Sequence, residues 1–327
     1  MEYAGRYPMF DFSRITTCPL AERNNTLTLD RLKHPESAAG AADRFPHDDL
    51  RRVVEHMLSA RERDLPVIFF TGAHQLKLGF SPLVIDLMKR GVITLLACNG
   101  AVTIHDFELA LIGETSENVP SALPEGSFGM AHETGVNMNA ALIAGNEERI
   151  GYGEALGRLI ATGEPLGLDC PHRDISLLGS AWELGIPATV HATIGTDIID
   201  QHPNFDGAAK GGCSGRDFGI FAQHVTRLAG GGVVLNVGSA VTGPEVLLKT
   251  VSMAANIGCP PRGLITANFD LRAASWDANI HPSQAGFYYR DMKSVVTRIP
   301  EAFGGHGYMV QGNFLDTMPA LYDLLTR

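Results

Sequence analysis

Three ionisable side chains lie close together after an apolar run, at His105, Asp106 and Glu108. An imidazole beside a carboxylate can move a proton to or from a bound molecule, or hold a hydroxyl of a ligand. A carboxylate at the start of a helix is also stabilised by the helix dipole, so these residues could equally cap a helix. The sequence leaves both interpretations open.

Polar residues also follow each of five apolar segments that we interpret as buried strands. The carboxyl ends of the strands of an open parallel sheet lie on one edge, so these residues are expected to converge in space. Taken singly, each could instead be an ordinary helix cap or turn former. The residues are Thr71, Gly72, His74, Lys77, Asn99, Gly100, His105, Asp106, Asp197, His202, Asp206, Asn236, Ser239, Asn268 and Asp270.

Metal and nucleophile chemistry is not predicted. His191, His202, Asp197 and Asp206 have the side chains of metal ligands, but their spacing matches no standard zinc pattern. Cys213 has no activating base in its neighbourhood of the sequence. Neither a GxGxxG after a strand nor a GxxxxGK[ST] loop is present, so the standard nucleotide loops are absent.

A run of three glycines at 230–232 comes directly before the apolar residues Val233–Leu235. Glycine permits a tight turn and a close backbone approach, although it also marks any tight junction between a helix and a strand. A second small-residue turn follows at 238–240, and Pro244 then indicates the first turn of a helix. A helix, a strand and a helix separated by glycine turns are typical of a parallel α/β sheet.

Hydrophobic periodicity predicts α/β architecture along the whole chain. Residues 46–327 are expected to form a single domain with a doubly wound, mostly parallel sheet, and residues 1–45 an irregular arm that could lie on a neighbouring subunit. The loop 195–216 is long and polar, which is typical of functional loops. Strands are predicted at 66–70, 92–97, 188–194, 233–235 and 264–267, and helices at 48–63, 81–90, 105–112, 137–144, 152–161, 176–184, 217–228 and from 318.

Composition excludes several classes of protein. A hydrophobic content of 45% and a charged content of 19% over 327 residues predict a globular protein. The formal net charge of −10 argues against nucleic acid as a partner. The five cysteines are widely spaced without a CxxC, which favours a reducing compartment, and no signal pattern or long apolar run is present. We therefore expect a cytoplasmic protein with a small-molecule ligand and no membrane partner.

Three segments together resemble the deoxyhypusine synthase family. The first is TGAHQLKLGFSPLVIDLMKRGVITLLACNGAVTIHDFELAL at 71–111, in which Asn99-Gly100 stands at the family's glycine turn. The second is NFDGAAKGG at 204–212, which contains the family's aspartate–glycine pair. The third is LAGGGVVLN at 228–236, followed by ITANFD at 265–270. The resemblance spans roughly residues 65–275.

The resemblance implies a Rossmann-like domain that binds NAD at the strand ends near a subunit interface of a homotetramer. The family oxidises spermidine with NAD and transfers an aminobutyl group through a lysine imine. The NAD contacts that the resemblance implies in this chain are Thr71, Gly72, Asn99, Gly100, Asp206, Gly231 and Asp270.

The chain departs from the family where the transfer chemistry would lie. Leu235-Asn236-Val237 stands in place of the family's lysine–histidine–histidine run. The tryptophan–glycine–lysine segment is missing, since Ser275-Trp276-Asp277 carries no lysine and Lys293 lies in an unrelated context. His105 stands where the family has an acid. Aminobutyl transfer to a protein therefore has no lysine to carry it.

The sequence thus predicts an NAD-dependent enzyme of deoxyhypusine synthase type that acts on a small amine or related metabolite. His105, Asp106 and His191 are the residues expected to move protons while the cofactor carries the hydride. The alternative is a non-redox enzyme, or a ligand-binding protein, that uses the same crevice for a sugar, nucleotide or phosphate.

Overall fold

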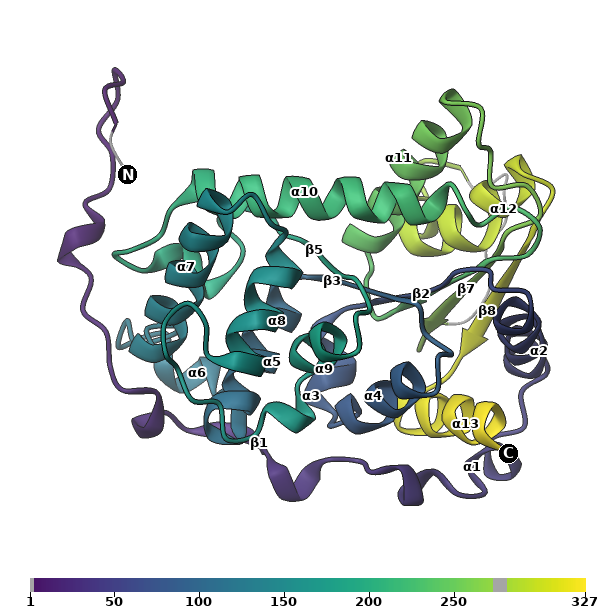
Figure 1. Cartoon of the computed structure of the whole chain (residues 1–327), viewed down its shortest axis with the longest axis horizontal. Helices are drawn as coiled ribbons and strands as arrows, with labels where there is room; N and C mark the ends of the chain where they lie inside the picture. The colour runs from purple at the N-terminus through teal and green to yellow at the C-terminus, as the bar shows by residue number, and fades with distance from the viewer. Residues whose placement is uncertain (1–2, 273–280) are drawn as a thin grey trace.

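A six-stranded parallel sheet runs through the middle of the computed structural model, which describes residues 3–272 and 281–327 (Figure 1). The chain passes from β2 outward through β3 to β5, then returns to place β6 beside β2 and continues outward through β7 to β8. This is the strand order of the Rossmann fold, and the point between β2 and β6 where the order reverses is its switch point. The strands are β5 (Ala188–His191), β3 (Leu95–Asn99), β2 (Val67–Thr71), β6 (Val233–Val237), β7 (Ile265–Asp270) and β8 (His306–Gln311).

Helices bury both faces of the sheet, which is why β2 is apolar at successive positions. Ile68 and Phe70 join one apolar cluster with α10 (Gly207–Val225), α11 (Thr242–Asn256) and α12 (Ile299–Ala302). Val67 and Phe69 join the other. The helices of this second cluster include α2 (Asp48–Glu62), α4 (Ser81–Lys89), α5 (Gly100–Ile112), α7 (His132–Glu147), α8 (Tyr152–Thr162), α9 (Leu177–Glu183) and α13 (Phe314–Thr326).

The N-terminal segment runs along the outside of this body (Figure 1). Its strand β1 (Asn25–Thr28) pairs antiparallel with β4 (Glu114–Glu117), and its short helix α1 (Ala41–Arg44) packs on α13. Tyr7 and Phe10, nearer the start of the chain, are exposed. The predicted division between an arm at 1–45 and a domain at 46–327 stays a prediction, but the second half of the arm pairs with the body rather than hanging free.

One buried carboxylate ties three elements together. Asp217, on α10, accepts hydrogen bonds from the backbone N–H of Val190 in β5 at 2.7 Å and of Gly153 in α8 at 2.9 Å. Burial raises the pKa of Asp217 to about 7, although these backbone hydrogen bonds favour the charged form. Asp217 therefore fixes where α10 lies against β5 and α8.

The structure corrects several predicted elements. α5 begins at Gly100 rather than 105, so His105, Asp106 and Glu108 lie inside the helix and do not cap it, and α7 begins at His132 rather than 137. The sequence does not predict β8, because its segment HGYMVQ carries polar residues at both ends. The strand lies at the edge of the sheet. α10 begins at Gly207 rather than 217, since Asp206 caps it while its glycines weaken the helical pattern. α13 begins at Phe314 rather than 318, because Asn313 caps it and Pro319 lies inside it. The predicted strands at 66–70, 92–97, 188–194, 233–235 and 264–267 correspond to β2, β3, β5, β6 and β7.

Two glycine-to-alanine changes test how closely the helices approach the sheet. A Cβ on Gly153 would lie 2.0 Å from the carbonyl oxygen of Ala188, so Gly153→Ala is expected to destabilise the protein by about 1–3 kcal/mol. A Cβ on Gly211 of α10 meets nothing within 4 Å, so Gly211→Ala is expected to stabilise it by about 0.5–1 kcal/mol. Urea unfolding measures the change in the free energy of unfolding for both variants. Equal changes for Gly153→Ala and Gly211→Ala would contradict the close approach of α8 to β5.

Candidate functional site

The loops after β2 and β6 touch at the switch point. The N–H of Gly72 donates to the carbonyl of Val237 at 2.9 Å, and a Cβ on Gly72 would lie 2.1 Å from the carbonyl oxygen of Gly238. Gly238 itself has φ +70°, which favours glycine. The two turns can therefore meet only as glycines, and the turn at 238–240 lines a cavity.

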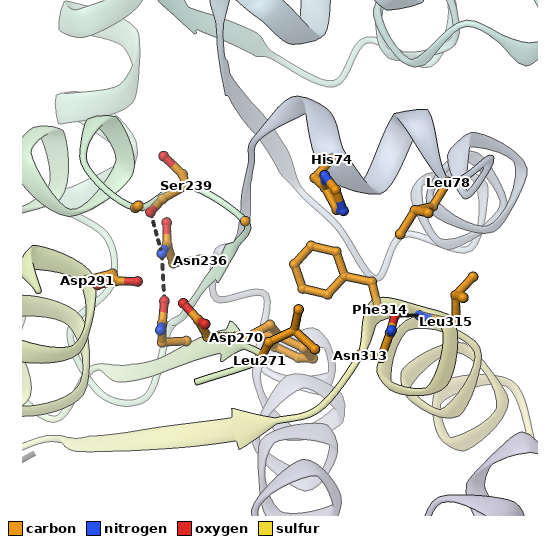
Figure 2. A pocket seen from close by; sticks show the side chains of 14 residues that line it. His74, Leu78, Asn236, Ser239, Asp270, Leu271, Asp291, Asn313, Phe314 and Leu315 are labelled. Carbon is orange, nitrogen blue, oxygen red and sulfur yellow. Dashed lines mark hydrogen bonds between the residues drawn. The ribbon is translucent and has the colours of Figure 1, made fainter. Parts of the chain in front are cut away.

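The first cavity, of about 400 Å³, lies over the carboxyl ends of β6 and β7 (Figure 2). Its floor is a pair of asparagines at matched positions of the two strands, with Asn236 Nδ2 donating to Asn268 Oδ1 at 2.7 Å and to the carbonyl of Ser239 at 2.9 Å. Asn236 Oδ1 is buried and has no hydrogen-bond partner among the described residues. This oxygen lies towards Gly243 of α11, where an added Cβ would come within 2.4 Å of it, so the floor presents the amide pair already bonded to itself.

Two carboxylates, from Asp270 and Asp291, line the same cavity with one guanidinium between them. Arg272 donates to both acids. Burial favours a raised pKa for Asp270, but the hydrogen bonds from Arg272 outweigh it and the pKa is lowered. Burial raises the pKa of Asp291 despite the charge of Arg272. The cavity is acidic overall. Its rim is apolar and aromatic and is formed by Leu78, Leu271, Phe314 and Leu315. His74 faces Phe314, with 6.0 Å between the ring centroids.

The second cavity, of about 220 Å³, lies over the other half of the sheet. The short helix α3 (Ala73–Lys77) separates the two, since His74 lines the first cavity and Lys77 the second. The remaining lining comes from the N-terminal segment, α5, the end of β4, the start of α6 (Val119–Ala122), Phe128 and the loop after β5. It includes Arg23, Ala101, Ile104, His105, Glu108, Glu117, Asp197 and Ile198.

The ionisable trio of α5 divides between two surroundings. His105 and Glu108 line the second cavity together, and Thr115 links them: it lies 2.8 Å from His105 Nδ1 and donates to Glu108 at 2.6 Å. Burial, with smaller effects of nearby charges, lowers the pKa of His105 to about 4. Asp106 points instead to α9, where it accepts from Ser176 Oγ and two backbone N–H groups, and burial raises its pKa to about 6.

His191 lies at the carboxyl end of β5 among aromatic rings rather than in either cavity lining. It stacks on Phe70 with ring centroids 5.4 Å apart and meets Phe221 edge-on at 5.1 Å. Burial lowers the pKa of His191 to about 3. The structure therefore does not bring together His105, Asp106 and His191, and their roles as proton-moving residues stay a prediction.

The predicted cofactor contacts occupy five separate places. Thr71 and Gly72 lie at the switch point and Asp270 in the first cavity, while Asn99 and Gly100 start α5, where Asn99 caps the helix and a Cβ on Gly100 would strike Asp197. Asp206 caps α10 outside both cavities. Gly231 precedes β6, at the amino end of the sheet beside Arg63.

A buried lysine that sequence reasoning missed shapes the loop after β5. Lys210 is 1% exposed, and its ammonium donates to Asp197 at 2.7 Å and to Asp200 at 2.5 Å. Burial raises the pKa of Asp197 even though Lys210 opposes this. The glycine-rich context of Lys210 gave no signal of its burial, because the partner acids lie in a separate loop.

Removing the buried cation is expected to be far more costly than removing a surface one. Lys210→Met leaves two buried acids without their partner and is expected to lower the free energy of unfolding by about 3–5 kcal/mol. Lys249→Met removes an exposed pair with Glu245 and is expected to lower it by less than about 1 kcal/mol. Urea unfolding of both variants measures this, and similar losses would refute the role given to Lys210.

His191 is expected to make the protein lose stability in acid. Its pKa is about 3 when folded and about 6.5 when unfolded, so the unfolded chain binds the extra proton and stability falls as the pH drops from about 6.5 towards 3. The contribution is at most about 1.4 kcal/mol per pH unit. His191→Phe should flatten this slope in urea unfolding at a series of pH values. Thr189→Val removes the hydrogen-bond partner of His191 but no titrating group, so it should leave this slope unchanged.

The described parts of the chain contain neither a membrane-spanning helix nor a group of metal-ligand side chains. No described helix combines the length and the apolar character needed to cross a membrane. Over residues 3–272 and 281–327, no three histidine, cysteine, aspartate or glutamate side chains are grouped as they would be around a metal ion. His191, His202, Asp197 and Asp206 accordingly form no such cluster.

No protein-family model and no curated protein matches this chain. Among solved structures it is similar to a conserved LOR/SDH protein from Methanococcus maripaludis, with 15% identity and a TM-score of 0.48 over 84% of this chain and 68% of that one. It is also similar to the cyanobacterial arginine dihydrolase ArgZ, with 14% identity and a TM-score of 0.46. It is similar as well to the protein AgrE in a complex with ornithine and NAD⁺, with 14% identity and a TM-score of 0.45.

This chain covers 32% of the length of ArgZ and of AgrE. The deoxyhypusine synthase family is not named among these structures. Similarity at this level says nothing about the ligand or the reaction of this chain.

Proposed function

We propose that the crevice at the switch point holds NAD and that the chain is an NAD-dependent enzyme acting on a small amine or related metabolite. The observation that carries the proposal is the contact between the turns at Gly72 and Gly238, with the first cavity lined by the second of these turns. Dinucleotides bind at the switch point of this fold. When bound, NAD would supply a hydride acceptor.

The lining of the crevice fits a dinucleotide. A Cβ on Gly238 would lie 3.0 Å from the ring of Phe314 in the first cavity, so glycine at this position leaves that space to a ligand. Asp270 suits sugar hydroxyls, and Leu271 and Leu315 offer apolar contact to a ring. The first cavity alone lies within the size range of small-molecule sites. Gly231 lies at the other edge of the sheet and is not part of the site proposed.

An amine fits the charge of the crevice. Two acids share one guanidinium in the first cavity, and the whole chain carries a net charge of −10. His105 in the second cavity is the group best placed to accept a proton from a substrate, because it lines the cavity while Asp106 is saturated by hydrogen bonds to α9. A non-redox enzyme or a binding protein for a sugar, nucleotide or phosphate is the competing proposal for the same crevice.

NAD binding tests the proposal. NAD⁺ at 100 times its dissociation constant is expected to raise the free energy of unfolding by about 2.7 kcal/mol. Asp270→Asn, which weakens acceptance from sugar hydroxyls, is expected to weaken NAD⁺ binding about tenfold in calorimetry. Asp316→Asn makes the same charge change on α13 outside the first cavity and should bind normally.

Two outcomes would decide against NAD. No stabilisation by millimolar NAD⁺, in protein shown to carry no co-purified cofactor, would reject the proposed cofactor. Stabilisation by a sugar phosphate or mononucleotide in its place, abolished in Asp270→Asn, would favour the competing proposal.

A further inference from the structure

We propose that the second cavity binds a small carboxylate that also bears a hydroxyl or an amine: the anion pairs with Lys77, and the hydroxyl or amine donates to Nε2 of His105. Thr115, Glu108 and Arg23 act as positioning residues that fix the imidazole for this contact. As the substrate class of the proposed enzyme, this rests on the proposed function, whereas the site itself depends only on the residues of the second cavity.

The hydrogen bonds determine which nitrogen of His105 carries the proton. A threonine hydroxyl has one proton, and Thr115 donates its proton to Oε2 of Glu108 at 2.6 Å. Thr115 can therefore only accept from His105 Nδ1, 2.8 Å away, which must carry the N–H. Nε2 then holds the lone pair, and it makes no hydrogen bond with the residues that the structure describes. His105 is thus a prepared acceptor in the cavity lining.

Glu108 stands at the far end of this chain as an acceptor. Its side chain is 1% exposed and accepts three hydrogen bonds: Arg23 Nη2 at 2.5 Å and Thr115 on Oε2, and Thr134 at 2.9 Å on Oε1. Both oxygens are thus used as acceptors by side chains that donate to them. The chain Arg23–Glu108–Thr115–His105 therefore has a single consistent arrangement of protons.

Lys77 is the complementary cation. It is exposed, it lines the same cavity as His105, and it forms no ion pair or hydrogen bond with the described residues. The other cation of this lining, Arg23, is already committed to Glu108. Lys77 is close enough to His105 for its charge to help lower the pKa of the imidazole.

The remaining lining selects a small monoanion. Glu117 and Asp197 also line the cavity, and although Lys210 compensates Asp197, Glu117 faces the single available cation, so a second negative charge on the ligand would have no cation to pair with. The cavity of about 220 Å³ suits a metabolite of few atoms, with Ala101, Ile104, Val119 and Phe128 as apolar walls. A single carboxylate paired with Lys77 leaves a neighbouring O–H or N–H free to reach Nε2.

A proton transfer at this contact balances without any co-reactant. The lone pair of Nε2 forms the new N–H bond, and the electron pair of the broken O–H or N–H bond stays on the ligand. The imidazolium so formed keeps its Nδ1–H on Thr115, and the carboxylate of Glu108 lies on the other side of that hydroxyl to stabilise the charge.

Alkylation of the protein without NAD tests the site independently of the cofactor. Iodoacetate carries a carboxylate that Lys77 would bind, and Nε2 would displace its iodide; iodoacetamide is the neutral analogue. Peptide mass spectrometry is expected to show His105 modified about tenfold faster by iodoacetate than by iodoacetamide. Lys77→Met should abolish this preference. Lys89→Met, which removes an exposed lysine at the end of α4, should retain it.

The positioning residues have their own measurement. Nitrogen-15 NMR of the His105 ring is expected to show Nδ1 protonated and Nε2 unprotonated at pH 7. Thr115→Val should remove this tautomer preference, and Thr115→Ser should restore it, while circular dichroism reports whether each variant folds. An equal rate for the two reagents in the wild type, or Nε2 protonated there, would overturn the proposal. Loss of NAD binding alone would leave it standing and reject only the proposed cofactor.

Discussion

The contact between Gly72 and the carbonyl of Gly238 is the constraint on which the rest of the site depends. It joins the two turns through backbone alone, so neither Gly72 nor Gly238 can carry a side chain at the switch point. The two cavities lie on opposite sides of α3, with an acidic asparagine-floored space over β6 and β7 and a histidine-lined space over the other half of the sheet. Helix α3, only five residues long, gives His74 to one and Lys77 to the other.

Buried charges position the elements around this crevice, and each is compensated in a different way. Asp106 binds the first turn of α9, Asp217 joins α10 to β5 and α8, and Lys210 gathers two acids of the loop after β5. A buried charge is tolerated only when its hydrogen-bonding capacity is used, so these residues specify the positions of their partners. Most of the polar residues that sequence reasoning selected for chemistry prove to have such local partners.

The sequence was sufficient for the fold because β2 and β6 are mostly apolar runs that each end at a glycine turn, a pattern typical of strands covered on both faces. The sequence could not assign His105 and Asp106 to different surroundings. Adjacent residues of a helix face different neighbours, and the neighbours here, Thr115 and Ser176, are set by tertiary packing. The sequence also placed Gly231 with the ligand turns, although it precedes its strand whereas Gly72 and Gly238 follow theirs. The predicted segment Ser275-Trp276-Asp277 lies outside the described residues.

The pairing of the N-terminal segment with the body has a consequence for the order of events during synthesis. Arg23 and β1 leave the ribosome early, yet Glu108 and β4, their partners, emerge only after most of α5 has been made. Until then the guanidinium and the strand edge have nothing to bind. The second cavity can therefore assemble only when the nascent chain has doubled back on itself, so its completion marks a late, long-range step in folding rather than a local one.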